Sequence, residues 1–273
     1  MKIAVVAPAR PLDQRLVGPL QEIVAEFPEV TLHLHPQCFL GDGHFAGPDA
    51  ARADALIEVG NDPAIDAVWF ARGGYGSNRL LARVMPALGP AAGAKTYLGY
   101  SDAGFLLGAL HARGIGRVAH GPMPGDLARS GGEAAVRRAL AWLARGDVAA
   151  LEPGLGARPA VAFNLTILAT LAGTPWLPDL TGHELLIEEV SEPLYRVDRL
   201  LFQLAHATAL AGIAGVRLGR VSDVIANDPP WGEALEAMIA RWCADRGAPY
   251  LGRAEIGHDA ANRIVPFGSA AIR

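Results

Sequence analysis

The stretch "GYSDA", residues 99–103, places a lone serine between a strand-like run and a helix-like run. A serine on a sharp strand-to-helix turn has the geometry of a nucleophile elbow, with small residues such as Gly99 and Ala103 two positions away on either side. The hydrolase consensus G-x-S-x-G would have glycine at Ala103. The alternative role for Ser101 is that of a helix N-cap, which is common for serine. The motif alone favours the cap.

A glycine-rich turn in "WFARGGYGSNRLL" supplies a second chemical feature. Gly73, Gly74 and Gly76 lie between an expected strand and an expected helix, where backbone amides can hold an anion or a developing oxyanion. The spacing is neither the G-x-G-x-x-G dinucleotide fingerprint nor a G-x-x-x-x-G-K-[ST] phosphate loop. A tight connection without a ligand explains the glycines almost as well.

Carboxylates and a histidine that could act with a serine occur later in the chain. "IEEVSEP" carries Glu188, Glu189 and Glu192 at the end of an expected strand, and "GHDAANRIVPFG" carries His258 in a loop. Adjacent strand residues point to opposite faces, so Glu188 and Glu189 cannot both face one site. A loop histidine becomes a candidate base only if a serine and a carboxylate reach it.

The sequence predicts no metal site. It has no H-E-x-x-H motif, and Cys38 and Cys243 lie far apart without a partner at metal-binding spacing. Its net charge of −4 gives no reason to expect nucleic acid or an anionic membrane as a partner. The start "MKIAVVAPAR" does not resemble a signal peptide, and no uncharged apolar run is long enough to span a membrane. We therefore expect a cytoplasmic protein.

The expected elements alternate between strands and helices as far as about residue 123. "KIAVVAPA", "IDAVWFA" and "KTYLGYS" read as buried strands, each followed by a helical pattern. This alternation predicts an α/β fold with a parallel, Rossmann-like sheet in the N-terminal domain. Beyond a Gly- and Pro-rich stretch, the pattern indicates a smaller α+β domain. We expect domains at 1–145 and 161–273, joined by a linker at 146–160.

Taken together, these motifs resemble the LD-carboxypeptidase family of serine peptidases (S66), which includes murein-peptide carboxypeptidases and the microcin-C immunity protein MccF. The matching segments follow the family's order and span most of the chain. They are "FAGPDAARADALIEVGNDPAIDAVWFARGGYGSNRLL", "LGYSDAGFLLGAL", "AHGPM", "NLTILATLAGTPWLPDLTGHELLIEEVSEPLYRVDRLLFQL" and "GHDAANRIVPFG".

The resemblance implies a Ser-Glu-His triad made of Ser101, Glu188 and His258, with no cofactor. Glu188, the first acid of "IEEV", matches the family's glutamate and is preferred over Glu189. The family's oxyanion donors are backbone amides, which correspond here to Gly74 and Asp102, with Gly73 as the alternative to Gly74. The implied substrate is a small cell-wall peptide from which a C-terminal D-residue is released during peptidoglycan recycling.

The chain departs from the family pattern before "NLT", where Ala162 and Phe163 stand in place of two glycines. This affects the cleft wall and leaves substrate preference open. One alternative is an immunity-type hydrolase of a peptidyl-nucleotide, for which Trp176 could supply a stacking wall. Another is a non-catalytic module that binds a small ligand. The oligomeric state, a homodimer or a monomer, also stays open.

Overall fold

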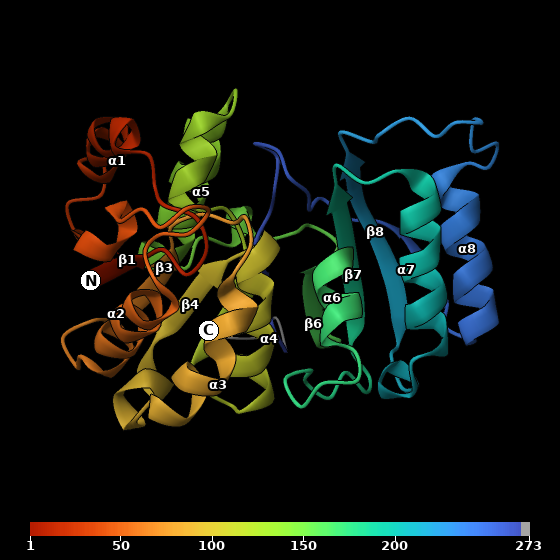
Figure 1. Cartoon of the computed structure of the whole chain (residues 1–273), viewed down its shortest axis with the longest axis horizontal. Helices are drawn as coiled ribbons and strands as arrows, with labels where there is room; N and C mark the ends of the chain where they lie inside the picture. Colours follow the sequence, from red (N-terminus) through yellow and green to blue (C-terminus); the bar gives the residue numbers. More distant parts are fainter. Residues whose placement is uncertain (269–273) are drawn as a thin grey trace.

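The computed structural model describes residues 1–268 and contains two sheets that lie side by side (Figure 1). The first has the strand order β10-β5-β4-β3-β1-β2. Five of its strands are parallel, and β10 is antiparallel to β5. The strands are β1 (Lys2–Val6), β2 (Thr31–Leu34), β3 (Ala67–Phe70), β4 (Thr96–Gly99), β5 (Arg117–His120) and β10 (Val265–Pro266).

Helices cover both faces of this sheet because its central strands are apolar on both sides. On β1, Ile3 and Val5 pack with α1 and α5, whereas Ala4 and Val6 pack with α2, α3 and α4. Alternating side chains on a buried parallel strand produce this division. The helices are α1 (Val17–Val24), α2 (Asp49–Asn61), α3 (Leu81–Val84), α4 (Gly104–Ala112) and α5 (Gly132–Arg145).

The second sheet has the order β6-β7-β8-β9, and all of its strands are parallel. This is more regular than the α+β arrangement we expected here. A helix follows each of the first three strands, and such crossovers return the chain in the same direction. The elements are β6 (Ala160–Asn164), α6 (Leu165–Leu171), β7 (Glu184–Val190), α7 (Leu194–His206), β8 (Gly215–Ser222), α8 (Leu235–Arg246) and β9 (Tyr250–Arg253).

The two sheets share one apolar core. Phe105 and Leu106 of α4 belong to the same buried cluster as Phe163 of β6 and Ile167 of α6. After β9 the chain returns to the first sheet, where Val265 of β10 pairs with β5. The segment between β9 and β10 therefore passes from one sheet to the other.

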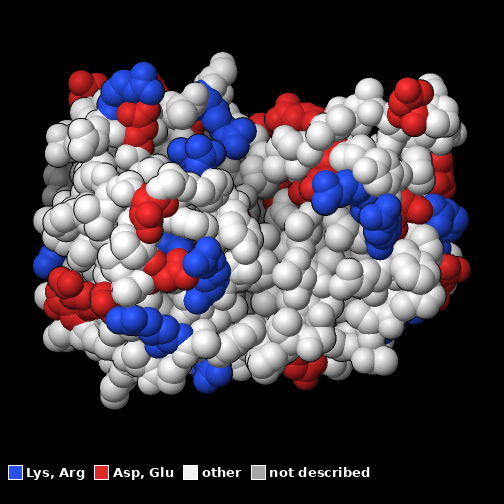
Figure 2. Space-filling view, viewed as in Figure 1, with Lys and Arg blue, Asp and Glu red and all other residues white. Residues whose placement is uncertain are grey.

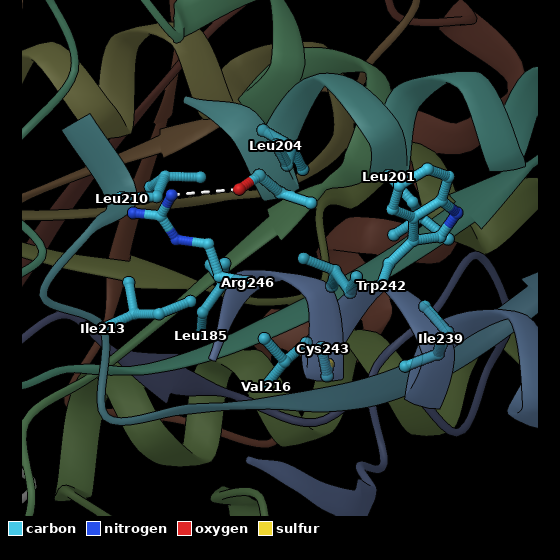
Figure 3. Close-up of a pocket in the computed structure, with 12 residues that line it drawn as sticks. Leu185, Leu201, Leu204, Leu210, Ile213, Val216, Ile239, Trp242, Cys243 and Arg246 are labelled. Carbon is cyan, nitrogen blue, oxygen red and sulfur yellow. Dashed lines mark hydrogen bonds between the residues drawn. The ribbon is translucent and has the colours of Figure 1, made fainter. Parts of the chain in front are cut away.

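A small apolar cavity lies within the second half, between α7, α8 and the sheet (Figure 3). Its volume is about 40 Å³, and its lining includes Leu185, Val216 and Cys243. Arg246 closes one side and donates from Nη1 to the carbonyl oxygen of Ala205 at 2.9 Å. Burial raises the pKa of the Cys243 thiol to about 11, so this side chain behaves as a neutral apolar group.

The α/β class predicted from the sequence is confirmed, with a parallel-dominated first sheet and a second parallel sheet. The domain limits at 145 and 161 stay a prediction. Within the described residues, no helix combines the length and apolar character needed to cross a bilayer.

Candidate active site

Ser101 lies at the carboxyl end of β4, on the first residue of a short 3-10 helix, Ser101–Ala103, that leads into α4. Its φ of 59° is left-handed, a conformation that costs a non-glycine residue free energy. The N-cap position belongs to Tyr100, which makes no side-chain cap bond. Ser101 is therefore not the helix cap that the motif alone favoured.

Small residues on both sides of the serine permit this turn. A Cβ built on Gly99 would lie 2.8 Å from Cδ2 of Phe70 and 3.2 Å from Cβ of Ala103. The β4 backbone thus runs too close to β3 for a side chain at position 99. Ala103 stands where the consensus has glycine, and its methyl group is buried in the apolar core.

The structure brings Ser101, His258 and Glu188 into one hydrogen-bonded chain. Ser101 Oγ lies 2.9 Å from His258 Nε2, and His258 Nδ1 lies 2.6 Å from Glu188 Oε2. Glu188 is on β7, and His258 is in the loop between β9 and β10. A carboxylate can only accept, so Nδ1 carries the proton, which leaves Nε2 free to accept from the serine hydroxyl.

The histidine loop is held by groups outside this chain of bonds. Arg129 Nη1 donates to the carbonyl oxygen of His258 at 2.6 Å, and the Gly257 amide donates to Asn262 Oδ1 at 3.1 Å. The same oxygen of Asn262 is 3.1 Å from Nε2 of His120. Burial lowers the pKa of His120 to about 4, so this second histidine stays neutral near pH 7.

The acid beside the histidine changes its proton affinity. Burial by itself lowers the pKa of His258, but the charge of Glu188 and its hydrogen bond to Nδ1 outweigh burial and raise the pKa above the ordinary value. Both side chains are buried, with 1% of Glu188 and 7% of His258 exposed. The pair therefore favours the imidazolium that forms when the histidine accepts a proton.

Glu189 points the other way, as strand alternation requires. Its Oε2 accepts from the Thr166 amide at 2.9 Å and from the Thr166 hydroxyl at 2.6 Å, while Oε1 accepts from Asn164 Nδ2 at 2.6 Å. Asn164 in turn caps α6 through a bond from the Ile167 amide. Glu189 thus ties the "NLT" segment to β7 and does not contact His258.

The glycine turn passes directly against the serine. A Cβ built on Gly73 would lie 2.9 Å from Ser101 Oγ and 3.7 Å from the Asp102 nitrogen. Gly74, with φ of 130°, adopts a conformation that other residues rarely reach. Among the described residues, the amides of Gly73, Gly74 and Asp102 donate to no protein acceptor. These amides are available to an oxyanion at Ser101.

The Asp102 side chain joins this turn to the segment that carries Ser101. Its carboxylate accepts from the Ser77 amide at 2.9 Å and from the Gly76 amide at 3.3 Å. Arg52, fully buried, donates to the carbonyl oxygens of Pro8, Gly47 and Gly76. The position of the glycine turn relative to Ser101 is therefore fixed from both sides.

A cleft of about 410 Å³ opens beside Ser101, between the two sheets. Sequence reasoning missed most of the residues that line it, among them Arg10, Arg72, Tyr100, Asp126, Arg129, Ser191 and Asp223. Ser101, Ser191 and Asp223 are the non-glycine residues with positive φ in the described chain, and all three line this cleft. Left-handed residues of this kind gather at functional sites.

Residues 1–268 contain no group of three or more His, Cys, Asp or Glu side chains placed to hold a metal ion. Trp176 is not among the cleft-lining residues. It packs against the core, with the Arg113 guanidinium 4.8 Å from its ring centre.

Comparison with known proteins identifies the family. The LD-carboxypeptidase N-terminal domain matches residues 3–121, and the LD-carboxypeptidase C-terminal domain matches residues 159–272. The chain belongs to the LD-carboxypeptidase family. A Synechocystis sp. protein that is named as a carboxypeptidase is 34% identical over 84% of this chain and 76% of its own length. The murein tetrapeptide carboxypeptidase of Pseudomonas aeruginosa is 29% identical over 96% of this chain and 94% of its own.

Two solved structures share the fold. The muramoyltetrapeptide carboxypeptidase from Oxalobacter formigenes superimposes with a TM-score of 0.82, at 24% identity, over 98% of this chain and 93% of its own. The microcin C7 self-immunity protein MccF gives 0.80 at 17% identity over 98% and 91%. The family membership predicted from the sequence is confirmed. The predicted enzyme class, a peptidase, is confirmed with it. The non-catalytic binding module is accordingly set aside.

Proposed function

We propose that the protein is a serine-type LD-carboxypeptidase that releases the C-terminal D-alanine of murein tetrapeptide in peptidoglycan recycling. The observation that carries this proposal is the bonded chain from Ser101 through His258 to Glu188, beside a cleft lined by free backbone amides. We propose the cytoplasm as its compartment, because peptides recycled from the wall are taken up into the cell.

In the first half of the reaction, Ser101 Oγ attacks the carbonyl carbon of the L-to-D amide while its proton passes to His258 Nε2. The tetrahedral oxyanion is held by the amides of Gly74 and Asp102. The C–N bond then breaks, and Nε2 gives its proton to the leaving amine. D-alanine departs, and the rest of the peptide remains as an ester on Ser101.

In the second half, His258 takes a proton from water, and the hydroxide oxygen attacks the ester carbon. The second oxyanion collapses, the C–O bond to Ser101 breaks, and Nε2 returns the proton to Oγ. Glu188 keeps its own charge throughout, holds the imidazole ring in place and stabilises the imidazolium in both halves.

The cleft and the relatives support a short peptide as substrate. A volume of about 410 Å³ falls in the range of small-molecule sites. Relatives that cover most of the chain are named for murein tetrapeptide and muramoyltetrapeptide. Tyr100 and Met123 provide apolar lining, while arginines provide positive charge.

The decisive experiment incubates the purified protein with murein tetrapeptide and measures D-alanine by chromatography. We expect D-alanine and tripeptide in equal amounts. A tetrapeptide that ends in L-alanine is the matched control and should remain intact. No release from the D-peptide, or equal release from both, would contradict the proposal.

The peptidyl-nucleotide alternative is tested in the same assay with an aminoacyl sulfamoyl adenosine as substrate. Trp176 is partly buried, packs beside Arg113 and does not line the cleft, so it does not supply the stacking wall suggested for it. Faster cleavage of the sulfamoyl adenosine than of the tetrapeptide would assign the protein to the immunity-type function instead.

A further inference from the structure

Three arginines line the cleft that contains Ser101: Arg10, Arg72 and Arg129. Arg10 and Arg72 follow β1 and β3, which are neighbours in the first sheet. Arg129 follows the 3-10 helix Pro124–Ala128. The carboxyl ends of parallel strands meet at one edge of a sheet, so segments far apart in sequence deliver positive charge to the same wall.

Arg129 is already engaged within the protein. Its Nη1 donates to the carbonyl oxygen of His258 at 2.6 Å, and its Nε donates to Asp126 Oδ1 at 3.3 Å. Asp126 also accepts from the Tyr100 hydroxyl at 2.6 Å and from the Met123 amide at 2.8 Å. The buried acid of this wall is thus committed to groups other than Arg10 and Arg72.

Arg10 and Arg72, in contrast, form no hydrogen bond or ion pair with any residue that the structure describes. Their stems are nevertheless held in place. A Cβ built on Gly74 would lie 2.5 Å from Cγ and Cδ of Arg10, and one on Gly125 would lie 2.6 Å from Cβ of Arg72. Both side chains therefore rest on glycine backbone beside the nucleophile.

This arrangement is electrostatically incomplete. Burial, together with the charges of Arg10 and Arg129, lowers the pKa of the half-buried Arg72. The fully buried Arg52 shows the usual solution, in which carbonyl oxygens and Asp49 surround the guanidinium. Asp126 and Asp13 are the acids that act on Arg72, and both are bonded to other groups. A half-buried guanidinium without an acceptor of its own can bind an external anion.

We propose that Arg72 and Arg10 form a carboxylate subsite that binds the free terminal carboxylate of the residue released at Ser101. Planar guanidinium groups bind carboxylates through paired hydrogen bonds, which fixes both position and orientation. The inference rests on the proposed function and deepens it, because it names the group by which the enzyme recognises a chain end. Asp223 lies on the opposite wall, after β8, and its charge disfavours a carboxylate there.

The subsite can be tested by binding alone, without hydrolysis. Calorimetry would compare N-acetyl-D-alanine with N-acetyl-D-alaninamide, which differ in the terminal carboxylate. We expect the wild type to prefer the acid. Arg72→Gln and Arg10→Gln should each weaken binding of the acid by about 10- to 100-fold, the range for hydrogen bonds to a charged group, and leave binding of the amide unchanged.

Two further variants make the test specific. Arg83→Gln removes a positive charge from an exposed ion pair with Asp54, outside the cleft, and should keep the wild-type preference. Arg72→Lys keeps the charge but loses the paired bonds, so it should retain part of the preference. If Arg72→Gln does not fold, Arg72→Lys and the exposed Arg10→Gln decide.

Equal wild-type affinity for acid and amide would overturn the subsite. So would an undiminished preference for the acid in a folded Arg72→Gln, Arg10→Gln double variant. A preference that disappears in these variants while the wild type releases no D-alanine from the tetrapeptide would support the subsite and contradict the proposed reaction. The two proposals can therefore fail separately.

Discussion

The backbone of Ser101 holds strain that its side-chain chemistry requires. Its left-handed φ of 59° directs Oγ toward His258 Nε2, 2.9 Å away. An L-residue in this conformation loses about 1–2 kcal/mol relative to its ordinary backbone, whereas glycine does not. Substitutions of Ser101 should therefore change stability and activity independently.

We predict that Ser101→Ala and Ser101→Gly both abolish D-alanine release, because neither can form the acyl-enzyme. Ser101→Ala should unfold close to the wild type, and Ser101→Gly should be more stable than Ser101→Ala by about 1 kcal/mol. Denaturant unfolding and the tetrapeptide assay measure the two effects. Near-normal turnover in either variant would show that Ser101 is not the nucleophile.

The neighbouring acids on β7 should differ in what their loss affects. Glu188→Gln keeps the size of the side chain but removes the charge that faces His258, so turnover should fall by as much as about 10⁴-fold, as for the orienting acid of another serine triad. Glu189→Gln should mainly destabilise the fold, by about 1–3 kcal/mol, because its amide group would face donors from Asn164 and Thr166.

Steady-state kinetics and thermal unfolding of the two variants provide the comparison. Each change removes one negative charge from adjacent positions, so each serves as the control for the other. A larger loss of turnover in folded Glu189→Gln than in Glu188→Gln would reverse the assignment.

The pH profile should report the Glu188–His258 pair. His258 must be neutral to accept the serine proton, so kcat/KM should rise with pH through the pKa of His258. Glu188 raises this pKa above the ordinary histidine value of about 6.5. The acid limb should therefore lie above that value in the wild type and move to lower pH in Glu188→Gln, where no carboxylate at position 188 opposes the effect of burial. An acid limb that does not move would show that another group controls it.

At the scale of elements, the glycine turn at Gly73 and the turn at Ser101 lie so close together that one added methyl group should push them apart. In Gly73→Ala the new Cβ would lie 2.9 Å from Ser101 Oγ. We expect kcat/KM to fall by at least about 10²-fold, since a misplacement of about 1 Å can have that effect, while the protein still folds. Gly93→Ala, whose Cβ meets nothing within 4 Å, is the control. Full activity in Gly73→Ala would contradict the contact.

The elements that could be predicted from sequence are those whose signal is local. Short apolar runs rich in β-branched and aromatic residues, such as "IDAVWFA", are typical of buried strands, and β3 forms there. The helix expected in "SNRLLARVMPAL" is instead broken into a 3-10 turn, the one-turn α3 and another 3-10 turn, with Pro86 in the last of them. Proline lacks the amide that a continuous helix needs at that point.

The parts of the site that could not be predicted depend on distant segments. Strand alternation predicted that only one of Glu188 and Glu189 faces the site. The resemblance favoured Glu188, which is the acid that contacts His258. Nothing local distinguishes Arg72 or Arg10 from surface arginines, because their shared cleft exists only once β1 and β3 pair. The hydrogen bonds of Glu189 with Asn164 and Thr166 had only a weak signal in the sequence, the polar "NLT" at the start of a helix.

At the scale of the whole molecule, the second half carries a packing defect that is separate from the cleft. The cavity of about 40 Å³ in Figure 3 shares no lining residue with the site. At about 24 cal/mol per Å³, filling it would stabilise the fold by at most about 1 kcal/mol. We predict that Val216→Ile raises stability by up to this amount and leaves kcat/KM unchanged.

Val148→Ile makes the same chemical change at a side chain that is 76% exposed, and should alter neither quantity. Urea unfolding of both variants beside the wild type measures the difference. A destabilised Val216→Ile would mean that the cavity is too narrow for the added methylene.

The surface shows why charge alone gave little guidance to function. On the face in Figure 2, acidic and basic side chains are interspersed over both halves. Arg137 pairs with Glu26 and Glu133, and Arg241 pairs with Asp198 and Glu233. Surface pairs of this kind contribute little to stability. The informative cations are Arg10 and Arg72 in the cleft, because the carboxylate of Asp126 is bonded to Arg129 and Tyr100 instead.

Because the chain returns to the first sheet near its end, Ser101 and His258 are synthesised at widely separated times. Ser101 leaves the ribosome 157 residues before His258, a delay of about 8–30 s at elongation rates of about 5–20 residues per second. The loop that carries His258 is then anchored by β10 against β5, which is made shortly after Ser101 and well before His258. A nascent or prematurely terminated chain therefore displays the serine without its base. On the proposed mechanism, hydrolysis requires His258, so we expect incomplete products of translation not to cleave peptides.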